Sequence, residues 1–232
     1  MQKIIFPDGE ELAFIFERKR IKRINLRVRR DGSVYVSAPL RTPTETVERF
    51  IREQREFIRR ARAEMAHLAP FADGCTVFYL GEPYRLCALK GKRGLTFANG
   101  KAILSLPDPT AELEKEYTRA LAALFLPTVT ARCHALEARF PHFAGRAKDI
   151  RVRAMKTMWG NCRPSEGRLT FSTALAAMPM RVVDNVVAHE YTHFDVKKHG
   201  ADFYLRFAEL SPDHAALDKE ISRLAREYRK QR

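Results

Sequence analysis

The chain has 232 residues, of which 42 are Lys or Arg and 28 are Asp or Glu, and its formal net charge is +14. A hydrophobic content of 45% with 15 Phe residues excludes a disordered chain, and the absence of any run of 18 apolar residues excludes a membrane span. A chain of this length forms one large domain or two small ones, and a pI near 9.9 makes polyanions plausible partners.

Alternating apolar and polar side chains characterise residues 1–40. An Asp31-Gly32 pair lies between two alternating runs, at residues 24–28 and 34–38. A period of two on both sides of such a pair predicts a β-hairpin. A helical stripe of apolar residues follows over residues 44–68, and residues 70–107 predict short strands separated by glycines.

The most basic segment spans residues 18–30, which contain eight basic residues and no acidic one. Clustered Lys and Arg side chains on paired strands could neutralise the phosphates of a nucleic acid. The alternative is a solvated outer face of the hairpin, because the same segment also supplies an apolar side. The candidate nucleic-acid-binding residues are Arg18, Lys19, Arg20, Lys22 and Arg23.

The second half of the chain is mostly helical. Apolar spacing predicts a helix over residues 111–139, interrupted or kinked at Pro127, and two short strands within residues 150–173 around a turn at 164–167. A helix is predicted after Pro179 to about residue 198, and a basic amphipathic helix over residues 213–229. These elements predict an α+β fold with a β-rich region containing one helix at 1–105 and a second domain at 106–232, which could share one core.

Cysteine usage indicates the compartment. The four cysteines are far apart and include no C-x-x-C pair, so they predict neither a disulfide framework nor a cysteine zinc site. The first residues lack the apolar stretch of a secretory signal. We therefore expect a cytoplasmic protein with free thiols and no membrane association.

An H-E-x-x-H sequence lies within the helix predicted after Pro179. His189 and His193 are four residues apart, so both imidazoles can face one cation from the same side of a helix. Glu190 is one step around the helix, which keeps its carboxylate out of the ligand shell yet beside a metal-bound water whose proton it can accept. The four valines at 182, 183, 186 and 187 form the apolar stripe that would bury this helix.

Two histidines leave a zinc site one ligand short, because catalytic zinc usually has three protein ligands. His199 is the preferred third ligand, with Gly200 helping the backbone turn back toward the metal. A metzincin is disfavoured because Val196 replaces the glycine of that pattern. The alternative is a gluzincin-type site, for which Glu209 is the available carboxylate.

The sequence around this motif resembles the YgjP-like metallopeptidase family. Residues 156–162 are K-T-M-W-G-N-C, residues 189–193 are H-E-Y-T-H, and residues 198–204 are K-H-G-A-D-F-Y. These correspond to the family's K-[ST]-x-W-G-[SN]-C, H-E-[LY]-x-H and N-H-S-x-x-F-[WY] patterns, and segments 27–39 and 79–84 also fit. Tyr191 with Thr192, and Lys198 with Gly200, depart from the usual residues without changing a ligand.

The resemblance implies a small zincin fold, related to the SprT-like and WLM proteases. It implies one zinc per chain held by His189, His193 and His199, with Glu190 as the base. Trp159 is expected to pack between the strand and the active helix, and Cys162 to be a buried thiol. Lys156 could stabilise an anion or pair with a carboxylate, and His214 is a weaker candidate for a transition-state donor.

Two functional hypotheses follow. The first is a zinc-dependent hydrolase, a metallopeptidase that cleaves a peptide or protein substrate by means of a Glu-activated water. The second is a nucleic-acid-associated module whose protease site acts near DNA or is vestigial. The basic segment at residues 18–30 is the feature that separates the two hypotheses.

Overall fold

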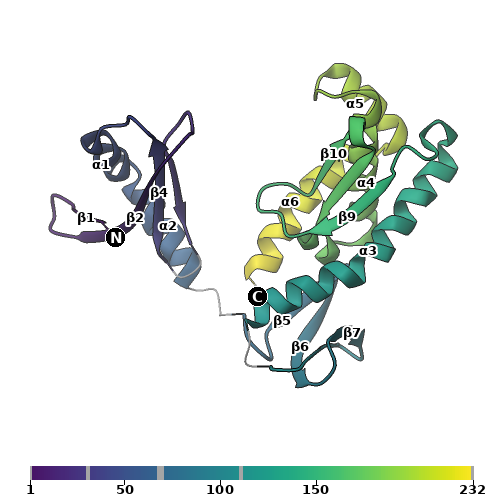
Figure 1. The fold of residues 1–232 in the computed structure, drawn as a ribbon, viewed down its shortest axis with the longest axis horizontal. Helices are drawn as coiled ribbons and strands as arrows, with labels where there is room; N and C mark the ends of the chain where they lie inside the picture. Colours follow the sequence, from purple (N-terminus) through teal and green to yellow (C-terminus); the bar gives the residue numbers. More distant parts are fainter. Residues whose placement is uncertain (1, 30–31, 67–70, 110–111, 231–232) are drawn as a thin grey trace. The chain divides into compact units, whose positions relative to one another are not determined.

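The computed structural model describes residues 2–29, 32–66, 71–109 and 112–230. Within these residues the chain forms six α-helices and three small sheets, which confirms the predicted α+β class. The chain divides into two units, Met1–Ala69 and Pro70–Arg232, and each is described by itself (Figure 1). None of the described helices is long and apolar enough to cross a membrane.

The first unit is built on a four-stranded sheet. Its strands are β1 (Gln2–Ile5), β2 (Glu11–Lys19), β3 (Asn25–Val28) and β4 (Val34–Pro39), in the order β1-β2-β4-β3. β3 and β4 pair antiparallel, which confirms the predicted hairpin, and the Arg29 backbone N–H donates to the Ser33 carbonyl where the turn begins. Gly32 adopts a φ of +75°, the left-handed conformation that glycine favours, whereas Asp31 lies outside the described residues.

Two helices cover this sheet where the sequence predicts one. α1 (Thr44–Glu53) and α2 (Arg55–Ala66) meet at Gln54, whose φ of −90° and ψ of 10° depart from helical values. Val47 and Ile51 in α1 and Ile58 in α2 are all buried in the same core as the sheet. The single-helix prediction was therefore wrong, because the apolar stripe continues across the break and hides it from the sequence. Residues 67 and 68 of that prediction lie outside the described residues.

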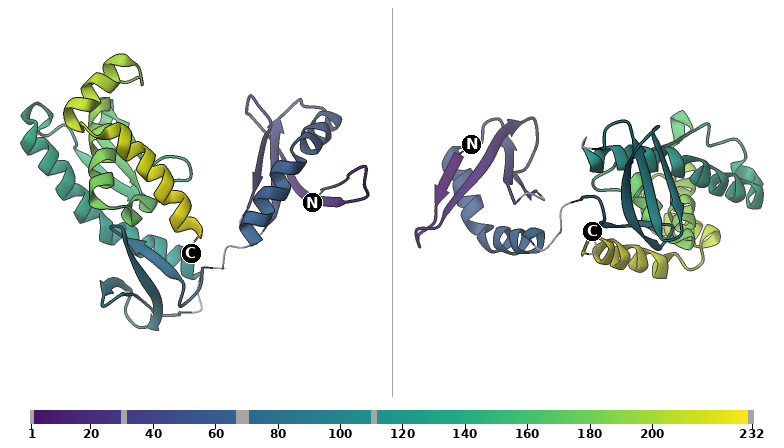
Figure 2. Two further views of the ribbon diagram at one scale, coloured as in Figure 1. Left: turned by 180° about the vertical axis from the view of Figure 1, so that it is seen from behind. Right: turned by 90° about the horizontal axis from the view of Figure 1, so that it is seen from below.

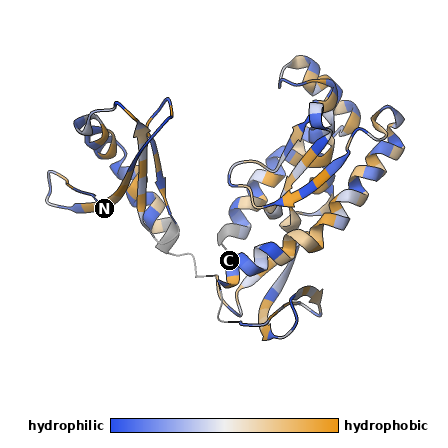
Figure 3. Ribbon diagram, in the orientation of Figure 1, coloured by the Kyte–Doolittle hydropathy of each residue, from blue (hydrophilic) through white to orange (hydrophobic). Residues whose placement is uncertain are grey.

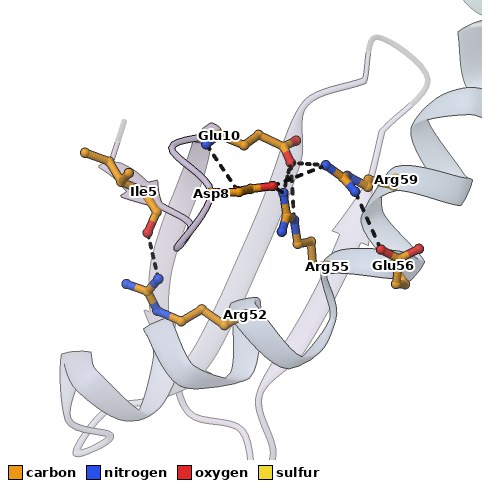
Figure 4. A network of polar contacts seen from close by, with 7 residues as sticks. All are labelled: Ile5, Asp8, Glu10, Arg52, Arg55, Glu56 and Arg59. Carbon is orange, nitrogen blue, oxygen red and sulfur yellow. Dashed lines mark hydrogen bonds and ion pairs between the residues drawn. The ribbon is translucent and has the colours of Figure 1, made fainter.

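Charged side chains connect the turn between β1 and β2 to α1 and α2 (Figure 4). Arg55 forms ion pairs with Asp8 and with Glu10, the latter at 2.5 Å, and Arg59 lies 2.7 Å from Glu10. Arg52 donates a hydrogen bond to the Ile5 carbonyl at 2.6 Å. These contacts lie at the surface of the unit, since the Asp8 side chain is 52% exposed.

The second unit begins with a sheet that the sequence assigned to the N-terminal region. Its strands are β5 (Thr76–Tyr79), β6 (Glu82–Lys90), β7 (Gly94–Ala98) and β8 (Lys101–Leu106), in the order β5-β6-β8-β7. Val77, Leu86 and Leu104 are buried in one core with Phe125 and Val183 from the helices that follow. The units thus divide at residues 69–70 and not near 105, because these strands bury their apolar faces against the later helices.

A long helix and a second small sheet complete the frame around the site. α3 (Leu113–Arg139) runs through Pro127 without interruption, and its buried stripe includes Tyr117, Phe125 and Cys133. β9 (Asp149–Arg153), β10 (Gly160–Arg163) and β11 (Arg168–Ser172) form a sheet in the order β10-β11-β9, with β9 parallel to β11. Hydrophobic and hydrophilic residues alternate along β9, whose Ile150 and Val152 pack on the core (Figure 3).

Three helices form the end of the chain: α4 (Met180–Asp195), α5 (Ala201–Leu210) and α6 (His214–Lys230). Short 3-10 helices at Pro141–Phe143, Pro164–Glu166 and Thr173–Ala177 connect the elements. α4 contacts α3, α5, α6 and β10, whereas α3 contacts β9 (Figure 2). α4 therefore lies at the centre of this unit, with β10 at the free edge of its sheet beside it.

Candidate metal centre

The burial of α4 orients its polar residues. The predicted apolar stripe is confirmed, because the valines at 182, 183, 186 and 187 are each at most 7% exposed. β10 contacts the same helix. Since residues four apart on a helix lie on one side, this packing directs His189 and His193 together toward the edge of the sheet.

Three histidines converge at this place. His189 and His193 come from α4 and His199 from the segment between α4 and α5, and one ring nitrogen from each lies within 4.8 Å of the others. The Nε2 atoms of His189 and His199 are 3.0 Å apart. The structure thus brings together all three histidines that the sequence and the family resemblance proposed as ligands.

The end of α4 sets the path to His199. α4 ends at Asp195, three residues before the predicted end, and Val196 is extended with its N–H donating to the Thr192 carbonyl. Asp195 forms ion pairs with Arg146 at 2.6 Å and Arg206 at 3.0 Å, which fix this end of the helix.

Gly200 does not bend the chain in the way the sequence predicted. It has a φ of −121° and a ψ of −170°, an extended conformation that any residue adopts, and a Cβ there would meet no atom within 4 Å. The reversal toward the metal centre is therefore made by the whole segment between α4 and α5, and a glycine is not needed at position 200.

An aromatic ring supports the three imidazoles. Phe203 is fully buried, and its ring centroid lies 4.9 Å from that of His189, 4.8 Å from that of His193 and 4.6 Å from that of His199. The His193 Nδ1 lies 3.2 Å from the Val196 carbonyl, to which it donates in one tautomer. That tautomer leaves Nε2 with a free lone pair, which is what a metal ligand requires.

Burial keeps two of these histidines uncharged. Desolvation lowers the pKa of His189 to about 4, with smaller contributions from His193 and His199. Desolvation also lowers the pKa of His193, against the effect of its hydrogen bond to Val196. Neutral imidazole is the form that binds a metal, so His189 and His193 require no deprotonation near pH 7 before they can hold one.

Glu190 is enclosed by the neighbouring strand. Its side chain is only 4% exposed, and burial raises its pKa to about 8, although a hydrogen bond from the Cys162 backbone N–H acts in the opposite direction. A Cβ added to Gly160 would lie 2.7 Å from the Glu190 Cγ and Cδ. Position 160 therefore has to be glycine for the carboxylate to lie against β10.

A cleft of about 610 Å³ opens onto the histidines and Glu190. Of the residues singled out in the sequence, Trp159 and Cys162 line it, and Trp159 also packs on the core. Burial, followed by the charge of Glu190, raises the pKa of the Cys162 thiol to about 12, so this residue is protonated and a poor nucleophile. The other lining residues are Met158, Gly160, Asn161, Pro164, Asn185, Val186, Lys197, Asp218 and Ile221.

Three other candidates lie elsewhere. Glu209, the alternative ligand, is outside the group of histidines and forms an ion pair with Arg206. Lys156 is exposed and does not line the cleft. His214 does not line it either; its ring packs on Phe207 and its Nδ1 lies 3.1 Å from the Ser211 carbonyl.

Sequence reasoning missed four residues of this site, namely Gly160, Asn185, Phe203 and Asp218. Asn185 could have been found, because it precedes His189 by four residues on the same helix. Gly160 and Phe203 occur within the family patterns, but only their contacts with Glu190 and the histidines explain them. Asp218 comes from α6 and gives no local signal in the sequence.

The basic residues of the first unit have two kinds of surroundings. Arg18 donates to the Leu40 carbonyl at 3.3 Å, and Lys19 forms an ion pair with Glu17 at 2.8 Å. Arg20, Lys22 and Arg23 are exposed in the connection between β2 and β3. Three of the five candidate residues are thus exposed and form no side-chain hydrogen bond or ion pair with another described residue, whereas two are engaged within the unit.

Comparison with known proteins gives one match. The family model described as YgjP-like, metallopeptidase domain, matches residues 22–224, which include both sheets of the second unit and all three histidines. No curated protein and no solved structure matches the chain.

Proposed function

The chain belongs to the YgjP-like metallopeptidase family, and from this premise we propose that it is a zinc-dependent peptidase. The observation that supports the proposal most directly is the convergence of His189, His193 and His199 beside the buried carboxylate of Glu190. Three histidine nitrogens with a carboxylate outside the group are the arrangement that hydrolytic zinc sites use.

The ligand set fits zinc. Three imidazole nitrogens within 4.8 Å of one another can approach a single ion, and imidazole is a common ligand for zinc. We propose one zinc per chain, held by His189, His193 and His199. When bound, zinc acts as a Lewis acid that polarises a carbonyl and lowers the pKa of water.

Glu190 is the proposed general base. It follows His189 directly and lines the cleft, so in its ionised form the carboxylate can accept a proton from water and then deliver it to the leaving amine. The contact with Gly160 and the Cys162 N–H holds the carboxylate in one position, which favours proton transfer in a defined direction.

An extended peptide is the proposed substrate. β10 lies at an edge of its sheet, and its residues Gly160, Asn161 and Cys162 line the cleft. Edge strands present unpaired backbone groups that a peptide can bind by adding a strand. We also propose a cytoplasmic location, because four free cysteines suit a reducing compartment.

The experiment that tests this function is the replacement Glu190→Gln. The amide cannot accept the proton, so cleavage of an unfolded protein substrate should fall by about 10²–10⁴-fold. Zinc content, measured by mass spectrometry of the metal, should stay near one per chain because Glu190 is not a ligand. Glu209→Gln is the matched control, and near wild-type cleavage by Glu190→Gln would exclude Glu190 as the base.

A second candidate function is contact with nucleic acid through the first unit. Its support is the exposure of Arg20, Lys22 and Arg23 in one connection, together with the net charge of +14. Such a segment could bring the peptidase to proteins on DNA by phosphate contacts alone. The corresponding measurement is salt-dependent DNA binding, which is described in the Discussion.

A further inference from the structure

One exposed carboxylate lines the cleft that opens onto the histidines. Among the described lining residues only Glu190 and Asp218 are acidic, and Glu190 is buried. Asp218 lies on α6 and is exposed. Its carboxylate is therefore the one acidic group of the described cleft wall that a substrate can reach directly.

A buried amide holds this carboxylate in place. Asn185 is only 2% exposed, and its Nδ2 donates to the Asp218 Oδ1 at 2.9 Å. The Ser211 hydroxyl in turn donates to the Asn185 Oδ1 at 2.7 Å, which satisfies the other end of the amide. Burying a polar side chain is costly unless its hydrogen bonds are made, and here they orient Asp218.

Asp218 differs from the other acidic residues of its helix. Glu220 pairs with Arg181 and Glu227 with Arg223, whereas no described Lys or Arg forms an ion pair with Asp218. One oxygen of Asp218 is engaged by Asn185, and the absence of a described Lys or Arg partner leaves the carboxylate open to a cation from outside the chain.

The position of Asp218 relates it to the scissile bond. Asn185 precedes His189 by four residues, so the two positions lie on the same side of α4 and about 6 Å apart along its axis. An extended peptide advances about 3.3 Å per residue. A substrate with its reacting carbonyl at the histidines would therefore place a group of an adjacent residue near Asp218.

We propose that Asp218, held by Asn185, binds an organic cation of the substrate beside the scissile bond and selects peptides with an ammonium or guanidinium group there. This inference depends on the proposed peptidase function. A hydrogen bond between two charged groups in a partly enclosed cleft is stronger than a neutral one, so it can discriminate between substrates. The cation comes either from a Lys or Arg side chain or from the free amino terminus.

The two sources are distinguished with matched peptides. One pair differs by Lys against norleucine next to the cleaved bond, and a second pair differs by a free against an acetylated amino terminus. The cationic member of one pair should be cleaved about tenfold or more faster in kcat/KM, because hydrogen bonds to charged groups contribute at this level. A preference within the first pair identifies the side chain, and a preference within the second identifies the terminus.

Asp218→Asn tests the residue itself. The substitution keeps an oxygen that can accept the hydrogen bond from Asn185 but removes the charge, so the ratio between cationic and neutral peptides should fall to about one. Asp218→Lys should reverse the preference toward a Glu-containing peptide. Glu82→Gln, which neutralises an exposed carboxylate of β6 outside the cleft, should keep the wild-type ratio.

The outcomes separate this inference from the proposed function. If peptides are cleaved without any preference for a cation, or if Asp218→Asn keeps the preference, the inference is overturned and the peptidase assignment stands. If the protein cleaves no peptide, the peptidase assignment fails. In that case, fluorescence anisotropy measures how tightly labelled Lys and norleucine peptides bind to zinc-loaded Glu190→Gln. Tighter binding of the Lys peptide that is lost in Asp218→Asn supports the role of Asp218, and equal binding of the two peptides overturns it.

Discussion

The first unit keeps its charged side chains at the surface, whereas the second unit buries Glu190 and partly buries His189 and His193 at its metal centre. In the first unit, hydrogen bonds from Arg55 lower the pKa of Asp8 and of Glu10 (Figure 4). In the second unit, burial raises the pKa of Glu190 to about 8 and lowers that of His189 to about 4. The pKa values of carboxylates are thus shifted in opposite directions in the two units, downward by hydrogen bonds from Arg55 in the first and upward by burial in the second.

This difference indicates where chemistry can occur. Exposed ion pairs stabilise a protein little, since water and salt screen them and long side chains lose freedom in forming them. Burial, by contrast, brings the pKa of Glu190 to about 8 and keeps His189 neutral at pH 7, and such perturbed pKa values cluster at catalytic and metal-binding sites. Charge density alone would have drawn attention to residues 18–30, but burial distinguishes the centre around α4.

The largest expected effect is the loss of the metal. His189→Ala and His193→Ala each remove a metal ligand. Each should therefore lower zinc affinity by more than the 10–100-fold that is typical for removing a residue that only orients a ligand. Zinc content after dialysis against a chelator measures this effect. His134→Ala, an exposed histidine of α3, is the control that should keep its zinc.

The third ligand is distinguished in the same assay. His199→Ala should lose zinc far more readily than Glu209→Ala, since His199 belongs to the histidine group and Glu209 is paired with Arg206. The opposite ranking would assign the third position to Glu209 and would make the centre a gluzincin-type site.

The next effect concerns the contact between β10 and α4. Gly160→Ala should displace the Glu190 carboxylate, because the new Cβ would lie 2.7 Å from its Cδ. Peptide cleavage should then fall toward the 10²–10⁴-fold loss expected for removing a general base, while zinc is retained. Gly94→Ala is the control, since its Cβ would meet only the Lys92 carbonyl at 3.9 Å. Unchanged cleavage by Gly160→Ala would show that the contact does not position Glu190.

A smaller effect is expected for the basic residues of the first unit. If they contact phosphates, replacing Arg18, Lys19, Arg20, Lys22 and Arg23 with Gln should flatten the dependence of DNA affinity on salt, because fewer counterions are released. Restoring Arg18 and Lys19 alone should recover little of the slope, since both are engaged within the unit. Zinc content should be the same in all variants. A wild-type protein that binds no DNA even at low salt would end this hypothesis.

The smallest effect is expected in the surface network of Figure 4. Arg59→Gln removes one of two arginines from Glu10, and the Arg59 side chain is 50% exposed, so the thermal unfolding midpoint should hardly move. Ile51→Ala in the same unit should be costly, by about 2–5 kcal/mol, because Ile51 is fully buried. Thermal unfolding of both variants measures the difference between their midpoints. A large decrease of the midpoint for Arg59→Gln would contradict the expectation that the surface network contributes little.

Local sequence was sufficient wherever neighbouring residues decide the structure. A spacing of four places His189 and His193 on one side of α4, and the four valines before them bury that helix. The alternating runs on either side of Gly32 form β3 and β4 as predicted. In each case the relevant geometry repeats within a few residues, so the periodicity of the sequence already contains it.

Tertiary structure decided what depends on partners distant in the chain. The strands between residues 76 and 106 could have packed on either half, and only their burial with Phe125 and Val183 assigns them to the second unit. The approach of Gly160 to Glu190, the support of three imidazoles by Phe203 and the fixing of Asp218 by Asn185 each join separate elements. Such contacts have no signature in local periodicity, because they depend on how helices and strands pack together after they form.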